Sequence, residues 1–218
     1  MKSIICQIMI GCMVLNLVSC NKNKQEEKLY ESFGVVKENG AGNFYIKTDM
    51  NNCIVPVNEK LTAKDKNARV WLLFLVKDGL EKADTVKAEV QQLLRISGVE
   101  IKTDGLSDLK NDPVNRLNAA WLAQDYLTLS LDLSSFSPEM LGSHKYFLYK
   151  QPSESVIDTV HIELRYDKNG DMGDRRYTKL LAVETAKIFD TIQKPSVVAL
   201  KYLKRNSDKP DEIYVKIE

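Results

Sequence analysis

The sequence predicts a mainly β protein, built from two domains that follow a secretion signal. Short runs in which apolar and polar residues alternate recur along the chain, and the clearest is residues 127–133, where four leucines face one side. Clusters of glycine, asparagine and aspartate separate these runs, as turns between strands require. A dense group of turn formers at residues 104–115 interrupts the pattern near the middle of the chain, and it predicts an interdomain joint.

Residues 1–19 are typical of a secretion signal. Lys2 precedes an uncharged, largely apolar stretch at residues 4–18, and a polar run at 21–27 follows it. A spanning helix needs about 20 apolar residues. The stretch is therefore too short and too poorly flanked to be a permanent membrane span.

The signal ends in Leu17-Val18-Ser19-Cys20, which resembles the lipobox of bacterial lipoproteins. The Cys20 sulfur would form a thioether with a lipid, and the small Ser19 would allow cleavage beside it. An ordinary secretion signal with an accidental cysteine is the alternative. We expect Cys20 to attach the mature chain to a membrane, with residues 20–28 as a flexible tether. Asn21 favours the outer membrane and leaves the orientation of the domains open.

Charge and cysteine content limit the function classes. Without Lys2, the mature chain would hold 30 basic and 30 acidic side chains, which is not the footprint of a nucleic-acid-binding protein. Cys6 and Cys12 leave with the signal, so Cys53 would be the remaining free thiol and no internal disulfide could form. Its apolar surroundings predict a small buried hydrophobic residue.

Five strands are predicted before the joint. A glycine-bearing hairpin signal at residues 39–43 separates the first two. The run 70–76 is continuously apolar and predicts a strand buried on both faces, while 83–96 fits both helical spacing and strand parity and is interpreted as a strand. The predicted strands are 30–36, 44–48, 54–57, 70–76 and 83–96.

The second half repeats the alternating pattern more regularly. Short strands at this spacing, with turn signals between them, suggest a β-sandwich. The predicted strands are 127–133, 146–149, 160–166, 177–183, 197–203 and 213–217.

Several short motifs, in this order, resemble the NigD-like lipoproteins. They are residues 42–49, 69–71, 111–114, 120–122, 125–129 and 161–166. The resemblance implies an OB-like β-barrel over residues 29–108 and a β-sandwich over 109–218, both antiparallel, in a protein of the cell envelope. The family takes its name from a bacteriocin gene cluster, in which one member was proposed as an immunity protein. It supplies no catalytic residues to transfer.

The residues offer little material for catalysis. His144 and His161 are the two histidines, and no zinc-protease, redox, P-loop or nucleophile-elbow motif is present. His161 lies within an alternating run and is interpreted as a strand-surface residue. We therefore predict a protein that is not an enzyme and has no cofactor.

A calcium loop is the sharpest alternative. Asp167, Asn169, Asp171 and Asp174 place oxygen ligands near alternate positions. Met172 replaces the glycine that such a loop requires, and Thr178 replaces its bidentate glutamate. A solvated hairpin explains the same residues through ordinary turn chemistry, so it is the preferred interpretation.

Two functions remain open. The favoured one is a non-catalytic envelope lipoprotein that binds another protein, in the form of bacteriocin immunity that the resemblance suggests. The alternative is a surface module that binds glycans or serves a carbohydrate-acting complex. Aromatic residues that could form a glycan platform are expected mainly to pack inside the domains: Phe44, Tyr45, Trp71, Trp121 and Tyr126.

Overall fold

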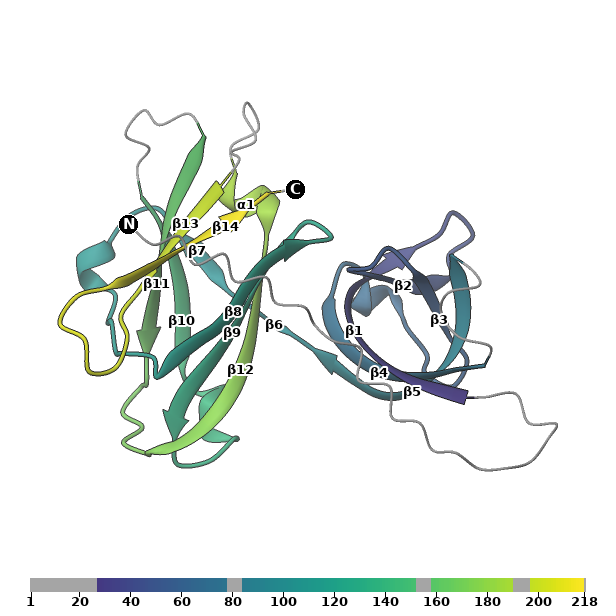
Figure 1. Cartoon of the computed structure of the whole chain (residues 1–218), viewed down its shortest axis with the longest axis horizontal. Coiled ribbons are helices and arrows are strands. Elements are labelled where there is room, and N and C mark those ends of the chain that lie inside the picture. The colour runs from purple at the N-terminus through teal and green to yellow at the C-terminus, as the bar shows by residue number, and fades with distance from the viewer. Residues whose placement is uncertain (1–26, 78–83, 152–157, 190–196, 218) are drawn as a thin grey trace. The chain divides into compact units, whose positions relative to one another are not determined.

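The computed structural model describes residues 27–77, 84–151, 158–189 and 197–217 (Figure 1). The chain divides into two compact units, Met1–Arg95 and Ile96–Glu218. Within the described ranges, no helix is both long and apolar enough to cross a membrane. The predicted signal sequence and Cys20 lie outside the described residues. The first strand begins at Glu27, so the end of the predicted tether 20–28 belongs to the fold.

The first unit is a closed barrel, which confirms a β-barrel as the first domain (Figure 1). Its strands pair in the order β1-β2-β3-β5-β4, and β4 closes on β1. The expectation of a wholly antiparallel barrel is wrong at β3 and β5, which pair in parallel because β4 lies between them in sequence. The strands are β1 (Glu27–Glu38), β2 (Phe44–Thr48), β3 (Cys53–Pro56), β4 (Arg69–Lys77) and β5 (Thr85–Arg95).

Strand β4 shows how the sequence builds the barrel core. Val70, Leu72, Phe74 and Val76 are buried, whereas the intervening apolar residues are partly exposed. The prediction that this strand is buried on both faces is therefore wrong, because a barrel of one sheet has a single packed interior. The other core residues are Tyr30, Val36, Ile46, Ile54, Leu61, Val86, Ala88 and Val90.

Gly34 allows β1 to lie against both of its neighbours. It pairs with Thr48 of β2 and Val70 of β4. A Cβ atom at this position would lie 2.6 Å from Ile46 Cγ2 and 2.7 Å from the Lys47 carbonyl oxygen. Glycine is therefore required where β1 bends into the closed barrel.

Asn58 extends the parallel pairing of β3 and β5 by means of its side chain. Its amide nitrogen donates to the Val90 carbonyl at 2.8 Å, and its amide oxygen accepts from the Val90 N–H at 2.8 Å. Gln91 is the extra residue where the register of β4 and β5 shifts. The Asn58 amide thus satisfies backbone groups beside this bulge.

We expect Asn58→Ala to lower the unfolding free energy of the barrel by about 1–2 kcal/mol, because two backbone groups lose their partner. Fluorescence-detected urea unfolding in a Trp121→Phe background would measure this, since Trp71 in β4 then reports on the barrel. The exposed Lys60→Ala is the control, with an expected change below about 0.5 kcal/mol. Equal stabilities for Asn58→Ala and Lys60→Ala would contradict the role of the amide.

The second unit is a β-sandwich, as predicted (Figure 1). One sheet has the order β14-β13-β11-β10-β7, and the other has the order β6-β12-β9-β8. The strands of the second unit are β6 (Ser97–Gly98), β7 (Glu100–Lys102), β8 (Arg116–Ala123), β9 (Tyr126–Ser135), β10 (Lys145–Lys150), β11 (Thr159–Asp167), β12 (Arg175–Glu184), β13 (Val197–Tyr202) and β14 (Asp211–Lys216).

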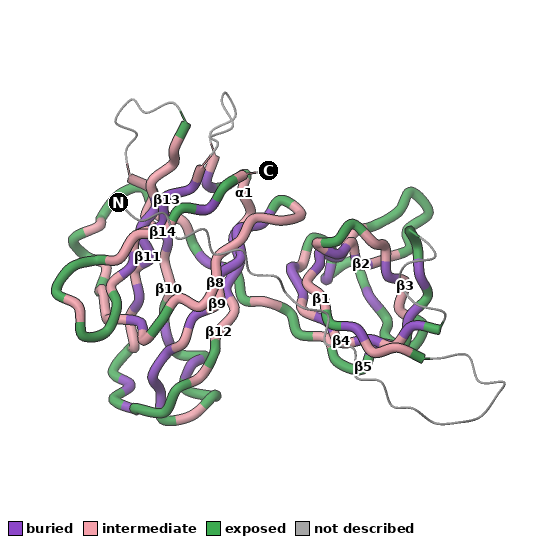
Figure 2. Tube along the Cα trace, viewed as in Figure 1, coloured by how far each residue is buried: buried purple, intermediate pink, exposed green. Residues whose placement is uncertain are grey.

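The core of the sandwich lies between the two sheets. The four alternating leucines of β9 are all buried, as the sequence predicted, although Thr128 between them is buried too. Ile162, Leu164 and Tyr166 of β11 belong to the same core from the opposite sheet. Buried residues line strands of both sheets (Figure 2). Alternation within each strand therefore supplies one apolar face per sheet.

The boundary between the units lies earlier than the predicted one at residues 108 and 109. The units divide between Arg95 and Ile96, and the short strands β6 and β7 join the sandwich by pairing with β12 and β10. The turn formers at residues 104–115 instead form a connection inside the second unit, which includes the 3₁₀ turn Leu106–Asp108. A turn signal marks the end of an element and cannot distinguish a domain boundary from a loop.

Three pairs of the sandwich are parallel, which corrects the expectation of an antiparallel domain. They are β6 with β12, β7 with β10, and β11 with β13. Each joins strands that are distant in sequence, so no hairpin dictates their direction. Strand β8 was not among the predicted strands; it pairs with β9 through a tight turn at Gln124 and Asp125, both of which have positive φ.

Candidate functional site

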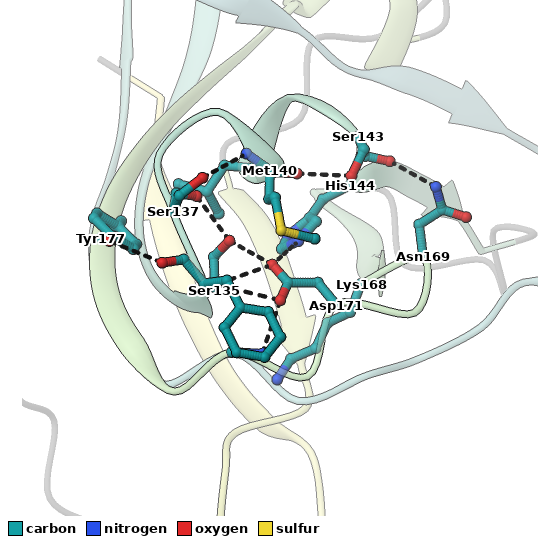
Figure 3. Close-up of polar contacts among 12 residues, drawn as sticks. Ser135, Ser137, Met140, Ser143, His144, Lys168, Asn169, Asp171 and Tyr177 are labelled. Carbon is teal, nitrogen blue, oxygen red and sulfur yellow. Dashed lines mark hydrogen bonds and ion pairs between the residues drawn. The ribbon is translucent and has the colours of Figure 1, made fainter.

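A cluster of buried polar side chains lies at one end of the sandwich. Ser135, His144 and Asp171 meet there (Figure 3). Tyr166 joins them through His144, and the four residues come from three separate segments of the chain. Ser135 ends β9, His144 immediately precedes β10, and Tyr166 lies near the end of β11. We call these four residues the buried cluster.

The turn between β11 and β12 brings Asp171 back toward the sandwich. Asn169 and Gly170 both have positive φ, at 51° and 85°, which suits an asparagine-glycine turn. The Asp171 N–H donates to the Lys168 carbonyl at 3.0 Å and closes the turn. The side chain of Asp171 then points inward, whereas Asn169 and Met172 on either side of it are exposed.

The Asp171 carboxylate is the centre of the cluster. Its Oδ2 atom accepts a hydrogen bond from the Ser135 hydroxyl and lies 3.0 Å from His144 Nε2. Its Oδ1 atom accepts from the Gly173 N–H at 2.8 Å and from the Phe136 N–H at 3.3 Å. This carboxylate therefore joins the β9 end, the β10 start and the β11–β12 turn.

His144 connects the carboxylate to the core. Its Nδ1 atom lies 2.7 Å from the Tyr166 hydroxyl, and the Tyr166 ring stacks on Tyr146 with 5.5 Å between ring centroids. In the neutral imidazole, a proton on Nε2 would be donated to Asp171, and Nδ1 would accept the phenol proton. Both ring nitrogens of His144 thus have partners inside the protein.

The surroundings fix the ionisation of these groups. Burial by itself raises the pKa of Asp171, but hydrogen bonds from the Ser135 hydroxyl, the Gly173 N–H, His144 and the Phe136 N–H lower that pKa to about 2. Burial raises the pKa of Tyr166 far above its ordinary value, with smaller contributions from Tyr146 and nearby aspartates. At neutral pH the cluster therefore contains a carboxylate and a protonated phenol.

The cluster does not have the geometry of a hydrolytic triad. In a triad the histidine lies between the carboxylate and the serine, whereas here Asp171 lies between Ser135 and His144. Ser135, His144 and Asp171 are also each at least 94% buried. The arrangement can hold two loops together, but it offers no solvent-facing nucleophile beside a base.

Gly173 makes the close contact of the two loops possible. A Cβ atom there would lie 1.9 Å from the Phe136 nitrogen and 2.1 Å from the Ser135 carbonyl carbon. No side chain fits in that space without displacing backbone. Glycine is therefore required two residues after the central carboxylate.

The structure places the four calcium candidates at separate positions. Asp167 Oδ1 accepts from the Asn169 N–H at 2.7 Å and lies 3.4 Å from Lys110 Nζ, and Asn169 itself donates to the Ser143 carbonyl. Asp171 points into the buried cluster, whereas Asp174 is exposed. Among the described residues, no group of three histidine, cysteine or acidic side chains is arranged to hold a metal. The hairpin forms, but Asp171 is buried rather than solvated.

Other predicted positions are placed as follows. His161 is partly exposed on β11, with Nδ1 3.9 Å from Glu212 Oε1, as expected of a strand-surface residue. Cys53 is partly exposed rather than buried, because it opens β3 at the edge of the barrel wall. Phe44 packs against the barrel core and Tyr126 is buried, whereas Tyr45, Trp71 and Trp121 are half-buried.

Sequence reasoning missed the buried cluster. The pairs of side chains that contact each other in it are 22 to 36 residues apart along the chain, and no motif spacing joins them. The signal that could have found it is the glycine at 173, two positions after an aspartate in a turn that already had an asparagine-glycine pair. A second glycine in so short a turn indicates a close approach of backbone.

The barrel has a buried charged pair of its own. Arg69, whose side chain is 1% exposed, places its two terminal nitrogens 2.5 and 2.6 Å from the carboxylate oxygens of Asp49. The guanidinium also lies 5.8 Å from the centroid of the Phe33 ring. The bidentate geometry satisfies both charges and indicates a structural role between β2 and β4.

Comparison with known proteins places the chain in a family. The NigD-like C-terminal beta sandwich domain matches residues 98–216, which begins within two residues of the second unit. No curated protein sequence matches the chain.

Several solved structures share the fold. A protein of unknown function from Bacteroides vulgatus has 14% identity and a TM-score of 0.70, covering 87% of this chain and 91% of that one. A lipoprotein candidate from Bacteroides fragilis has 14% identity and a TM-score of 0.69, with coverages of 87% and 98%. A NigD-like immunity protein from Bacteroides caccae has 21% identity and a TM-score of 0.63, with coverages of 84% and 91%. At these identities the comparison shows a shared fold over most of the chain and no more.

Proposed function

Because this chain belongs to the family defined by the NigD-like C-terminal beta sandwich domain, we propose that it is a non-catalytic lipoprotein of the cell envelope that acts by binding another protein. The family match over residues 98–216 is the observation that carries the proposal. The burial of Ser135, His144 and Asp171 supports the non-catalytic part, since their polar atoms are used to join loops.

The specific form that we propose is immunity to a bacteriocin. The similarity to a NigD-like immunity protein from Bacteroides caccae supports it, although at 21% identity that similarity concerns the fold. The lipobox ending at Cys20 supports attachment to the envelope, with the outer membrane favoured. An immunity protein held at the membrane could meet an incoming toxin before the toxin acts.

Deletion of the gene tests this proposal. We expect the deletion strain to become more sensitive to bacteriocins than its parent strain, and wild-type protein to restore protection. Cys20→Ala should accumulate without palmitate label and fail to protect, whereas the matched thiol variant Cys53→Ala should be labelled and protect. Unchanged sensitivity of the deletion strain, together with no partner recovered by crosslinking in the envelope, would refute the proposal.

A second candidate function is glycan capture by the outer face of the β14-β13-β11-β10-β7 sheet. Tyr214 is 63% exposed and donates a hydrogen bond to Glu212 at 2.6 Å, and Tyr149 and His161 point to the same face. An exposed aromatic ring beside charged hydrogen-bonding groups is suited to a sugar. A glycan array that is blank for residues 27–218 would remove this candidate.

A further inference from the structure

Three large apolar side chains are exposed together at the end of the sandwich that contains the buried cluster. Phe136 is 56% exposed, Met140 38% and Met172 83%. The first two belong to the connection between β9 and β10, and Met172 belongs to the β11–β12 turn. Figure 2 shows mostly exposed residues in the loops at this end, which is the lower end of the sandwich in the view. We call these three residues the apolar tip.

The two loops that carry the apolar tip are fixed against each other. Gly173 packs so closely on the backbone of Phe136 that no side chain fits between them. Asp171, next to Met172, accepts a hydrogen bond from Ser135 (Figure 3) and another from the Phe136 N–H. Phe136 and Met172 are therefore held exposed by buried structure, and the loops cannot fold inward to cover them.

Basic side chains flank the loops of the apolar tip. Lys168 precedes Met172, Arg175 and Arg176 follow it, and Lys145 begins β10 opposite Asp167. Glu139 and Asp174 are the exposed carboxylates of the same loops. The remaining two acids are already engaged, since Asp167 faces Lys110 and Asp171 faces His144. The surface around the tip is thus basic.

The shape of the tip decides which partner fits. A stable protein interface buries about 800 Å² on each partner, and three side chains on two turns supply only a fraction of that area. Binding to a bilayer does not require so large a contact area, because single apolar side chains can enter its interfacial layer while cations contact anionic headgroups. We propose that the apolar tip inserts into the interfacial layer of an anionic membrane, with the surrounding lysines and arginines on the headgroups.

This contact would be independent of the protein partner under the proposed function. It would give the sandwich a second attachment to the bilayer, in addition to acylated Cys20. Two attachments limit how a domain can orient on a surface. The tip would then fix which face of the sandwich is presented to a partner.

Vesicle sedimentation of residues 27–218 tests the inference. This fragment contains both hydrophobic cores and lacks Cys20, so the acyl anchor cannot contribute. We expect it to bind vesicles of phosphatidylglycerol and phosphatidylcholine, and to bind pure phosphatidylcholine vesicles much more weakly. The double variant Phe136→Ser/Met172→Ser should reduce the partition coefficient by about tenfold or more. Lys168→Gln/Arg175→Gln should reduce it on the anionic vesicles alone.

The barrel provides the matched control. Met50→Ser/Val57→Ser removes two apolar side chains that are exposed to a similar degree, and its partition coefficient should equal that of the wild type. Circular dichroism would verify that each variant is folded. Absence of wild-type binding, or equal loss in the tip and control variants, would overturn the inference. So would a tip variant that binds vesicles normally but loses a crosslinked protein partner, because the tip would then be a protein contact. None of these results would bear on bacteriocin immunity itself.

Discussion

Gly173→Ala is expected to lower the unfolding free energy of the sandwich by about 4 kcal/mol. The added methyl group would lie 1.9 Å from the Phe136 nitrogen, and the obstructing atoms are backbone, which cannot rotate away. Relief requires the β11–β12 turn to move off the end of β9, and that movement would break the hydrogen bonds to Asp171. Since most domains have a stability of only about 5–15 kcal/mol, we expect a sandwich that is close to unfolding at 37 °C.

Urea unfolding in a Trp71→Phe background would measure this loss, because Trp121 in β8 then reports on the sandwich. Gly142→Ala is the matched control: it lies in the connection between β9 and β10, and a Cβ atom there meets nothing within 4 Å. Its expected change is below about 0.5 kcal/mol. If both variants unfold at the same urea concentration as the parent protein, the two loops do not pack as described.

Asp171→Ala is expected to destabilise the sandwich by about 3–5 kcal/mol. The substitution leaves the His144 ring and two backbone N–H groups without their acceptor, and leaves the Ser135 hydroxyl with the Ser137 carbonyl alone. Asp171→Asn keeps one oxygen acceptor and should lose about half as much. The exposed Asp174→Ala, three residues away, should change stability by less than about 0.5 kcal/mol.

Lowering the pH should also remove the contribution of Asp171 to the unfolding free energy. The pKa of Asp171 is about 2 in the folded protein and near 3.8 in the unfolded chain, so its ionised form stabilises the fold. That stabilisation is complete above about pH 5 and decreases as the pH falls toward 2. The difference in unfolding free energy between the parent and Asp171→Asn should therefore narrow over this interval. A difference that stays constant from pH 6 to pH 2 would show that Asp171 is not the ionised centre of the cluster.

Most individual strands could be predicted because their pattern is local. Strand β2 was predicted with its observed bounds, Phe44–Thr48, and the alternating leucines of β9 identified its core face. A strand with one buried face has apolar and polar residues at alternate positions, so its pattern is visible in a few neighbouring residues. The segment 83–96 was ambiguous because both periods fitted, and pairing of β5 with β3 and β4 decides it.

The sequence-based predictions fail where residues far apart along the chain determine the structure. Strands β6 and β7 have two and three residues, too few to show a period, and they exist because β12 and β10 offer open edges. Parallel pairing in both units depends on which strands become neighbours after folding. The turn formers at residues 104–115 were interpreted as a joint because a loop inside a domain has the same composition.

The sequence by itself therefore determined most of the longer strands, the mainly β class, the order of barrel and sandwich, and the resemblance to a family that the match over residues 98–216 confirms. Only the tertiary structure decided the domain boundary, the parallel pairs, the burial of Asp171 with Ser135 and His144, and the exposed grouping of Phe136, Met140 and Met172. The physical reason is how far apart along the chain the interacting residues lie. Strand formation follows side-chain alternation between adjacent residues, whereas the cluster and the tip arise from loops more than 20 residues apart that meet only when both sheets have formed.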